Sequence, residues 1–131
     1  EVIDPTAVAV GGMTMGADPI AVATATHADR PLRAFSVRKE AKEHGTGGRI
    51  VGPLRSGERV AVVEDTTTTG GALLEALDVL EDAGVDVAQV IVLVDRSDGR
   101  VESLMAERSL PYVVLVTPAV LGVAETAEAA G

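Results

Sequence analysis

Short apolar runs alternate along this chain with longer stretches in which apolar residues recur every three or four positions. Five runs have strand length and are rich in valine, which is typical of strands buried on both faces of a parallel sheet. The expected strands are residues 7–10, 32–37, 60–63, 90–94 and 111–116.

The stretches between these runs predict helices. Residues 71–83 have a wide apolar face of period near 3.6, and Gly84 is suited to end that helix. A second helix is expected over 19–28, with Asp18 as N-cap and Pro19 at its first position, and a third over 100–109. Strands alternating with helices indicate an α/β fold: a single domain built on a parallel sheet with right-handed crossovers.

Residues 38–49 interrupt the pattern because they are polar and glycine-rich and have little to bury. We expect a mobile loop here, with its two flanks as candidates for pairing in a ribbon. By composition alone, a solvated charged loop is the favoured interpretation.

The amino-acid composition argues against several classes of protein. The chain has 131 residues, of which 47% are hydrophobic and 24% charged, so it is long enough for one globular core. It has no cysteine, and therefore no disulfide or thiolate metal site. Phe35 and Tyr112 are its two aromatic residues, which argues against stacking on single-stranded nucleic acid. No apolar run approaches membrane length, and we expect a cytoplasmic protein with no membrane partner.

The net charge is −9, which also argues against nucleic acid as a partner. The charge is uneven, because residues 27–49 carry six basic and three acidic residues and are net positive. A basic segment in an acidic protein is a candidate anion site.

The stretch 59–74 carries the most specific chemistry. A buried strand leads into the acid pair Glu64-Asp65, then into four threonines and a Gly-Gly pair that open a helix. Free N–H groups of such a loop and of the first helical turn bind phosphate, and glycine permits close approach. Two carboxylates beside an anion loop favour a ligand with hydroxyl groups, such as a sugar phosphate. The alternative is a plain strand–turn–helix junction whose acids are solvated and whose threonines cap the helix.

A second glycine-bearing loop, residues 11–16, follows the first strand. Its spacing matches neither the dinucleotide fingerprint nor the P-loop, and close packing of a helix on a strand explains it equally well.

The pattern of strand, Glu64-Asp65, small polar loop and Gly-Gly-Ala72 resembles the phosphoribosyl pyrophosphate (PRPP) motif of type I phosphoribosyltransferases. The run 38–45, Arg-Lys-x-x-Lys-x-His-Gly, resembles the catalytic loop of the orotate phosphoribosyltransferases. Asp95-Arg96, after a strand and before Gly99, resembles that family too, although an ion pair of Arg96 with Asp95 or Asp98 is a plain alternative. The resemblance runs from about residue 4 to residue 123.

The resemblance implies roles for individual residues. Glu64 and Asp65 would accept hydrogen bonds from the ribose hydroxyls of PRPP. Arg96 and Thr68 would contact orotate. The loop that binds the 5′-phosphate would comprise Thr66, Thr67, Thr68, Thr69, Gly70, Gly71 and Ala72. The pyrophosphate would contact Gly12, Met13 and Thr14 of the first glycine loop, and the catalytic residues Arg38, Lys39, Lys42 and His44.

The implied reaction converts orotate and PRPP into orotidine 5′-monophosphate and pyrophosphate, a step of pyrimidine synthesis. The resemblance implies Mg²⁺ bound through PRPP rather than by protein side chains. It also implies a homodimer in which the loop 38–49 is shared across the interface.

Departures from the family leave other functions open. Family members have some tens of residues before the first strand, forming a hood over the base, whereas this chain starts almost at the sheet; a fragment or a shortened homologue is expected. The first glycine loop lacks a lysine that some relatives have. The rivals are a non-catalytic PRPP-binding or regulatory module, a phosphoribosyltransferase for another nucleobase, and a structural α/β domain. Residues 1–123 are expected to form the core domain and 124–131 an Ala/Glu-rich tail.

Overall fold

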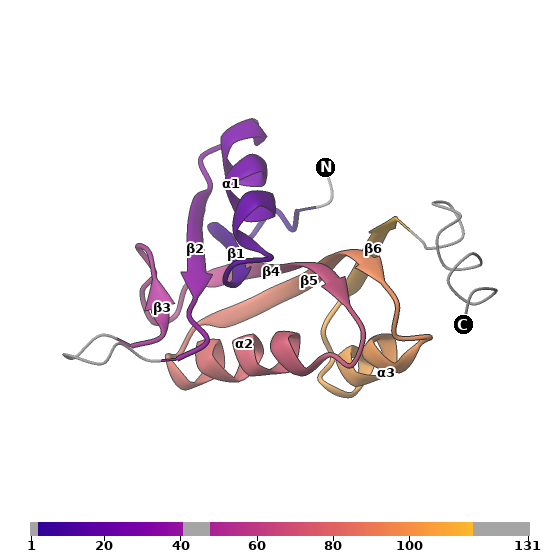
Figure 1. Cartoon of the computed structure of the whole chain (residues 1–131). Helices are drawn as coiled ribbons and strands as arrows, with labels where there is room; N and C mark the ends of the chain where they lie inside the picture. The colour runs from indigo at the N-terminus through magenta and orange to yellow at the C-terminus, as the bar shows by residue number, and fades with distance from the viewer. Residues whose placement is uncertain (1–2, 41–47, 117–131) are drawn as a thin grey trace.

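A computed structural model describes residues 3–40 and 48–116 of the chain (Figure 1). Within this part the backbone forms a six-stranded sheet in the order β3-β2-β1-β4-β5-β6. The strands are β1 (Ala9–Met13), β2 (Arg33–Val37), β3 (Ile50–Val51), β4 (Arg59–Thr67), β5 (Asp86–Asp95) and β6 (Tyr112–Val116). Every neighbouring pair is parallel except β2 and β3, which are antiparallel. The predicted parallel α/β sheet is therefore confirmed, with one short antiparallel edge strand.

The helices form a layer on each side of the sheet. Helix α1 (Asp18–His27) lies on one face, and α2 (Gly71–Asp82) and α3 (Arg100–Glu107) lie on the other (Figure 1). The valines of β4 pack against both layers. Val60 and Val62 pack with the side chains of α2, whereas Val63 packs with Ala21 of α1 and with Ala17 immediately before it. This division follows from the period-2 alternation of side chains along a strand.

Two strands extend beyond their predicted ends. Gly11, Gly12 and Met13 belong to β1 rather than to a loop, because they pair with residues 35–37 of β2. Glycine suits the first two positions, since a Cβ at Gly11 or Gly12 would lie 2.2 Å from the carbonyl oxygen of Phe35 or Val63, respectively. The strand β4 continues through the acid pair to Thr67, because Thr66 and Thr67 pair with Val94 and Asp95 of β5. β-branched threonine suits this extension.

The helix ends lie within two residues of the predicted ones, and the predicted N-cap of α1 is wrong. Asp18 is not the N-cap of α1 but its first residue; the cap is Ala17, which makes no side-chain capping hydrogen bond. The Asp18 carboxylate instead accepts hydrogen bonds from the hydroxyls of Thr14 at 2.6 Å and Ser36 at 2.8 Å. The stop at Gly84 is confirmed, because Gly84 has φ +77° two residues after α2 ends.

The connections place two strand ends side by side. From β1 the chain crosses through α1 to β2 on one side, whereas from β4 it crosses through α2 to β5 on the other. The carboxyl ends of β1 and β4 are therefore neighbours where the winding direction reverses. In open α/β sheets, ligands bind at such a switch point.

The flanks of the segment 38–49 pair as expected, because β2 and β3 form an antiparallel ribbon at the edge of the sheet. Within the described residues, no helix combines the length and apolarity needed to cross a bilayer. The proposed boundary between residues 123 and 124 lies outside them.

On the face that carries α1, the far part of the sheet stays partly open. Leu93 of β5 and Leu115 of β6 are 37% and 46% exposed. A groove of about 220 Å³ beside them is lined by apolar side chains that include Ile20, Ile91 and Leu115.

Candidate functional site

The acid pair lies in the last part of β4, at the carboxyl edge of the sheet. Glu64 is 6% exposed and Asp65 half-buried. One oxygen of Glu64 accepts a hydrogen bond from the N–H of Asp65 at 3.1 Å, and Oδ1 of Asp65 accepts one from the N–H of Thr66 at 2.7 Å. The backbone thus holds both carboxylates at the edge where β1 also ends.

Glu64 is electrostatically unusual. Burial, together with the adjacent Asp65 carboxylate, raises the pKa of its carboxyl from 4.5 to about 7. A hydroxyl donor or a positive charge beside this carboxyl would favour its ionised form. A cationic sugar transition state or a ribose hydroxyl would supply such a partner.

The threonine and glycine segment after β4 forms the turn into α2. Thr66 and Thr67 lie in the strand, and Thr67 is buried, so the connecting turn begins at Thr68, two residues later than predicted. Thr68, Thr69, Gly71 and Ala72 are exposed.

Gly70 shapes this turn. It has φ +86° at the N-cap of α2, and no side chain caps the helix end. The Thr69 hydroxyl instead accepts a hydrogen bond from the N–H of Gly71 at 3.2 Å. The sequence also allowed a plain strand–turn–helix junction in which threonines cap the helix, and this hydrogen bond to a helix-end N–H agrees with that part of it. The first-turn N–H groups and the positive end of the helix dipole still face this turn, which makes it suited to an anion.

The end of β1 lies directly against the acid pair. A Cβ at Gly16 would lie 2.7 Å from Oδ1 of Asp65, so this position admits no side chain without a shift. Met13 is 4% exposed and packs in the core, so its backbone rather than its side chain is available to a ligand. Thr14 is held by Asp18.

The basic segment begins one strand further along. Arg38 follows β2 and is half-buried, and Lys39 is exposed. Arg49 fastens the two ends of the segment together: its Nε donates to the carbonyl of Arg38 at 2.8 Å, one Nη donates to the carbonyl of Lys39 at 2.7 Å, and it also pairs with Glu75 of α2. Lys42 and His44 lie outside the described residues.

Arg96 follows β5 and is exposed. Its backbone N–H donates to the carbonyl of Thr67 at 2.8 Å, which brings it beside the turn after β4. Asp95 is not its partner, because that carboxylate accepts hydrogen bonds from the N–H of Ser97 and the hydroxyl of Tyr112, both at 2.7 Å. Burial tends to raise the pKa of Asp95, but these hydrogen bonds outweigh it and leave the pKa lowered.

The described site residues therefore gather at one edge of the sheet, at the carboxyl ends of β1, β2, β4 and β5. Sequence reasoning missed three side chains with contacts at this edge: Asp18, Arg49 and Arg100, whose Nε donates a hydrogen bond to the carbonyl of Thr69 at 3.3 Å. Asp18 was assigned to a cap, and no local motif marks the other two, whose partners lie far away in the sequence.

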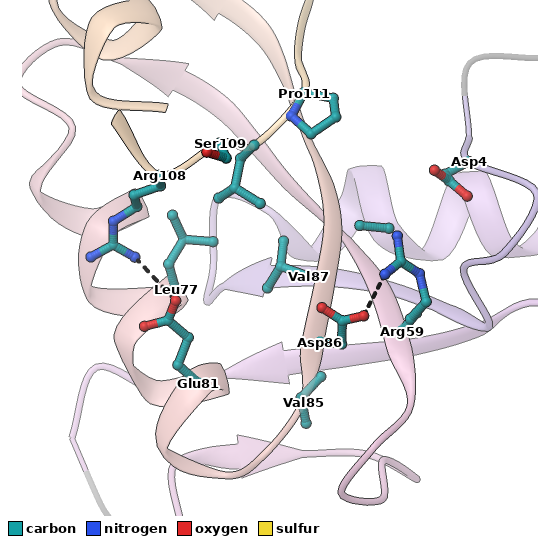
Figure 2. A pocket seen from close by; sticks show the side chains of 12 residues that line it. Asp4, Arg59, Leu77, Glu81, Val85, Asp86, Val87, Arg108, Ser109 and Pro111 are labelled. Atoms are coloured by element: carbon teal, nitrogen blue, oxygen red, sulfur yellow. Dashed lines mark hydrogen bonds and ion pairs between the residues drawn. The ribbon is translucent and has the colours of Figure 1, made fainter. Parts of the chain in front are cut away.

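Not every hollow belongs to this edge. A cavity of about 460 Å³ lies at the opposite end of the sheet, where β5 begins and α3 ends (Figure 2). Its arginines already have carboxylate partners, since Arg59 pairs with Asp86, and Arg108 pairs with Asp78 at 2.7 Å and lies 3.9 Å from Glu81. This neutralised cavity is not the candidate phosphate site.

Among residues 3–40 and 48–116, no three His, Asp or Glu side chains cluster closely enough to hold a metal ion. Glu64 and Asp65 alone offer two carboxylates, fewer than the six oxygens that Mg²⁺ takes. These residues fit an ion that is held mainly by the oxygens of its ligand and by water.

Comparison with known proteins agrees with this arrangement. The phosphoribosyl transferase domain model matches residues 3–124, and the chain belongs to that family. Similar relatives within it are orotate phosphoribosyltransferases. The chain is 52% identical over 115 residues to that of Corynebacterium glutamicum strain R, covering 87% of this chain and 61% of the relative. It is 47% identical over 122 residues to that of Pyrococcus furiosus, covering 93% and 63%.

Among solved structures, the Mycobacterium tuberculosis orotate phosphoribosyltransferase in complex with PRPP superposes with a TM-score of 0.79 at 42% identity. The match covers 90% of this chain and 67% of that one. The chain thus spans about three fifths of the length of the curated relatives it matches.

Proposed function

We propose that this chain transfers the 5-phosphoribosyl group of PRPP to orotate, giving orotidine 5′-monophosphate and pyrophosphate. The observation that carries the proposal is the meeting of β1 and β4 at the switch point. There an acid pair, a glycine-shaped turn at a helix N-terminus and a second glycine-bearing strand end share one edge. The similarity to orotate phosphoribosyltransferases supports the choice of reaction.

Each group then has a role that suits its chemistry. The turn 68–72 takes the 5′-phosphate, and Glu64 and Asp65 accept hydrogen bonds from the ribose hydroxyls. The backbone of Gly12, Met13 and Thr14 faces the pyrophosphate. Arg96 and Thr68 contact orotate, since the guanidinium fork suits a planar anion.

The reaction breaks the bond between C1 of the ribose and the pyrophosphate oxygen, and a ring nitrogen of orotate, after losing its proton, forms the new bond to C1. Negative charge grows on the leaving pyrophosphate and positive charge on the sugar. Arg38, Lys39, Lys42 and His44 stabilise the first, and the acid pair stabilises the second. Mg²⁺ bound together with PRPP would neutralise part of the pyrophosphate charge.

The proposal includes a cytoplasmic homodimer in which residues 38–49 of one protomer reach the site of its partner. The position of β3 supports this, because β3 is an edge strand and the two ends of the segment, Arg38 and Arg49, therefore lie at the edge of the sheet. Sedimentation velocity measures the dimer.

The deciding experiment is a steady-state assay of orotate consumption with PRPP and Mg²⁺, run beside calorimetric titration of PRPP. Loss of orotate with release of pyrophosphate supports the proposal. Binding of PRPP without turnover would instead identify a non-catalytic PRPP-binding protein. Turnover with adenine or hypoxanthine in place of orotate would identify a different nucleobase. The absence of PRPP binding at millimolar concentration would leave a structural domain.

A further inference from the structure

The start of α3 is fastened to the turn that follows β4. The Nε of Arg100, the first residue of α3, donates a hydrogen bond to the carbonyl of Thr69 at 3.3 Å. Beside it, a Cβ at Gly70 would lie 3.1 Å from Val101 and 3.5 Å from Leu104. The turn 68–72 is therefore backed by α3, and its shape depends on that helix.

No carboxylate among residues 3–40 and 48–116 forms an ion pair with Arg100. Arg30, Arg38, Arg55 and Arg96 also have no ion pair in this part of the chain, whereas the other four arginines each pair with a carboxylate. The two arginines at the ends of α3 differ in this respect. Arg108, the C-cap of the helix, is paired with Asp78, whereas Arg100 at its start has no such partner in the described residues. Arg100 is also exposed, so its remaining donors face solvent beside the turn.

The turn itself supplies no cation. Residues 66–72 carry no basic side chain, and the acid pair lies immediately before them. A 5′-phosphate dianion would meet neutral N–H and hydroxyl donors next to two carboxylates. A guanidinium has five N–H donors, and the hydrogen bond to Thr69 uses one of them. Those that remain suit two phosphate oxygens.

We propose that Arg100 is a further substrate-binding residue, which selects the terminal phosphate of the sugar. It holds the Thr69 carbonyl away from the ligand and offers its free donors to the 5′-phosphate. This inference deepens the proposed function and rests on it, and it separates the recognition of the 5′-phosphate from that of the pyrophosphate, which lies at the end of β1.

The test is titration calorimetry with two ligands, ribose 5-phosphate and inorganic pyrophosphate with Mg²⁺, on the full chain. For Arg100→Ala we expect ribose 5-phosphate to bind about fivefold to twentyfold more weakly, and pyrophosphate to bind within about twofold of the parent value. Arg100→Lys, which keeps the charge but loses the fork, should recover most of the affinity. The dependence of log Kd on log salt concentration should be shallower for Arg100→Ala than for the parent protein.

Arg108→Ala is the matched control, because it removes the same side chain at the C-cap of α3 and should leave both affinities unchanged. Urea unfolding of Arg100→Ala should keep the parent midpoint. Equal loss of both ligands, or no loss of ribose 5-phosphate, overturns the role of Arg100 while the proposed function stands. A parent protein that binds pyrophosphate but not ribose 5-phosphate, or neither ligand, overturns the proposed function and this inference together.

Discussion

Glu64 combines burial with a functional position. Its carboxyl sits at the edge of the sheet with 6% exposure, and burial followed by the adjacent Asp65 raises its pKa to about 7. A buried acid of this kind lowers stability when it ionises, and proteins retain such groups where a ligand uses the charge. This favours a role in binding over a role in folding.

Replacing Glu64 by glutamine should stabilise the protein in a pH-dependent way. The folded-state pKa lies above the ordinary 4.5, so the folded state holds the proton more tightly and loses stability as pH rises from about 4.5 to 7. Glu64→Gln avoids that loss. We expect a gain in unfolding free energy on the order of 1 kcal/mol at pH 8, after allowing for solvent screening, and almost none at pH 5. Urea unfolding at both pH values measures it, with Glu107→Gln as an exposed control. A gain that does not change with pH would contradict the assignment.

Lys42 and Asp65 should separate catalysis from binding. Lys42→Ala is expected to lower kcat about a hundredfold while the Kd for PRPP changes by less than about threefold, because a cation over the leaving group acts mainly in the transition state. Asp65→Asn should weaken PRPP binding and turnover together, since the proposed site would place the ribose against this side chain in both the ground state and the transition state. Single-turnover kinetics and calorimetry provide the two numbers. Unchanged turnover in Lys42→Ala would show that the loop assignment is wrong.

At the scale of elements, the site depends on two contacts that support it. One joins the two ends of the segment 38–49, which we call its stem, and the other is the packing of α3 on the turn after β4. Arg49 closes the stem through two backbone carbonyls and Glu75. Gly70 allows α3 to approach. Both contacts join residues distant in sequence, and each has a variant that tests it. Arg49→Ala removes the first contact. Gly70→Ala perturbs the second, and because Gly70 lies in the turn proposed to bind the 5′-phosphate, its effect is measured on stability alone.

Arg49→Ala should slow turnover about threefold to tenfold with little change in PRPP affinity, because the free ends of the segment would close over the leaving group less often. Glu75→Gln provides the comparison, since it removes the ion pair and leaves the two backbone hydrogen bonds. An exposed ion pair contributes less than about 1 kcal/mol, so Glu75→Gln should behave almost as the parent protein. If Arg49→Ala and Glu75→Gln slowed turnover equally, the loss would come from the ion pair rather than from the two backbone hydrogen bonds of Arg49.

Gly70→Ala should destabilise the fold more than Gly99→Ala. Both glycines have positive φ, +86° and +88°, so each alanine carries backbone strain of about 1–2 kcal/mol. Only at Gly70 does the new methyl also meet Val101, whereas the space around Gly99 is open. The difference between the two urea midpoints therefore measures how tightly α3 packs on the turn, and equal midpoints would mean that α3 yields freely.

The sequence predicted the order of strands and helices well and their ends less well. Valine runs and the period of residues 71–83 are local signals, and the structure follows them. The extension of β1 and β4 depends instead on partners: Phe35 and Val63 fill the space over Gly11 and Gly12, and β5 pairs with Thr66 and Thr67. The roles of Asp18 and Arg100 were missed for the same reason, because their partners become neighbours only in the folded chain.

At the scale of the whole molecule, the topology of the sheet brings the residues of the candidate site together. Residues from the ends of β1, β2, β4 and β5 meet at one edge because parallel strands bring all their carboxyl ends to the same side. The opposite end holds a cavity whose arginines are neutralised. The candidate site thus occupies one end of the sheet only. Motifs that are far apart in the 131-residue sequence therefore lie close enough together to contact one ligand.

The exposed side chains of Leu93 and Leu115 affect how dye-binding experiments on this chain are interpreted. Amphiphilic dyes such as anilinonaphthalene sulfonate fluoresce when they bind apolar surface, and we expect some dye fluorescence from the native domain. This signal would raise the baseline of a thermal shift assay, so dye fluorescence alone should not be used to measure unfolding of this chain. Circular dichroism avoids that difficulty.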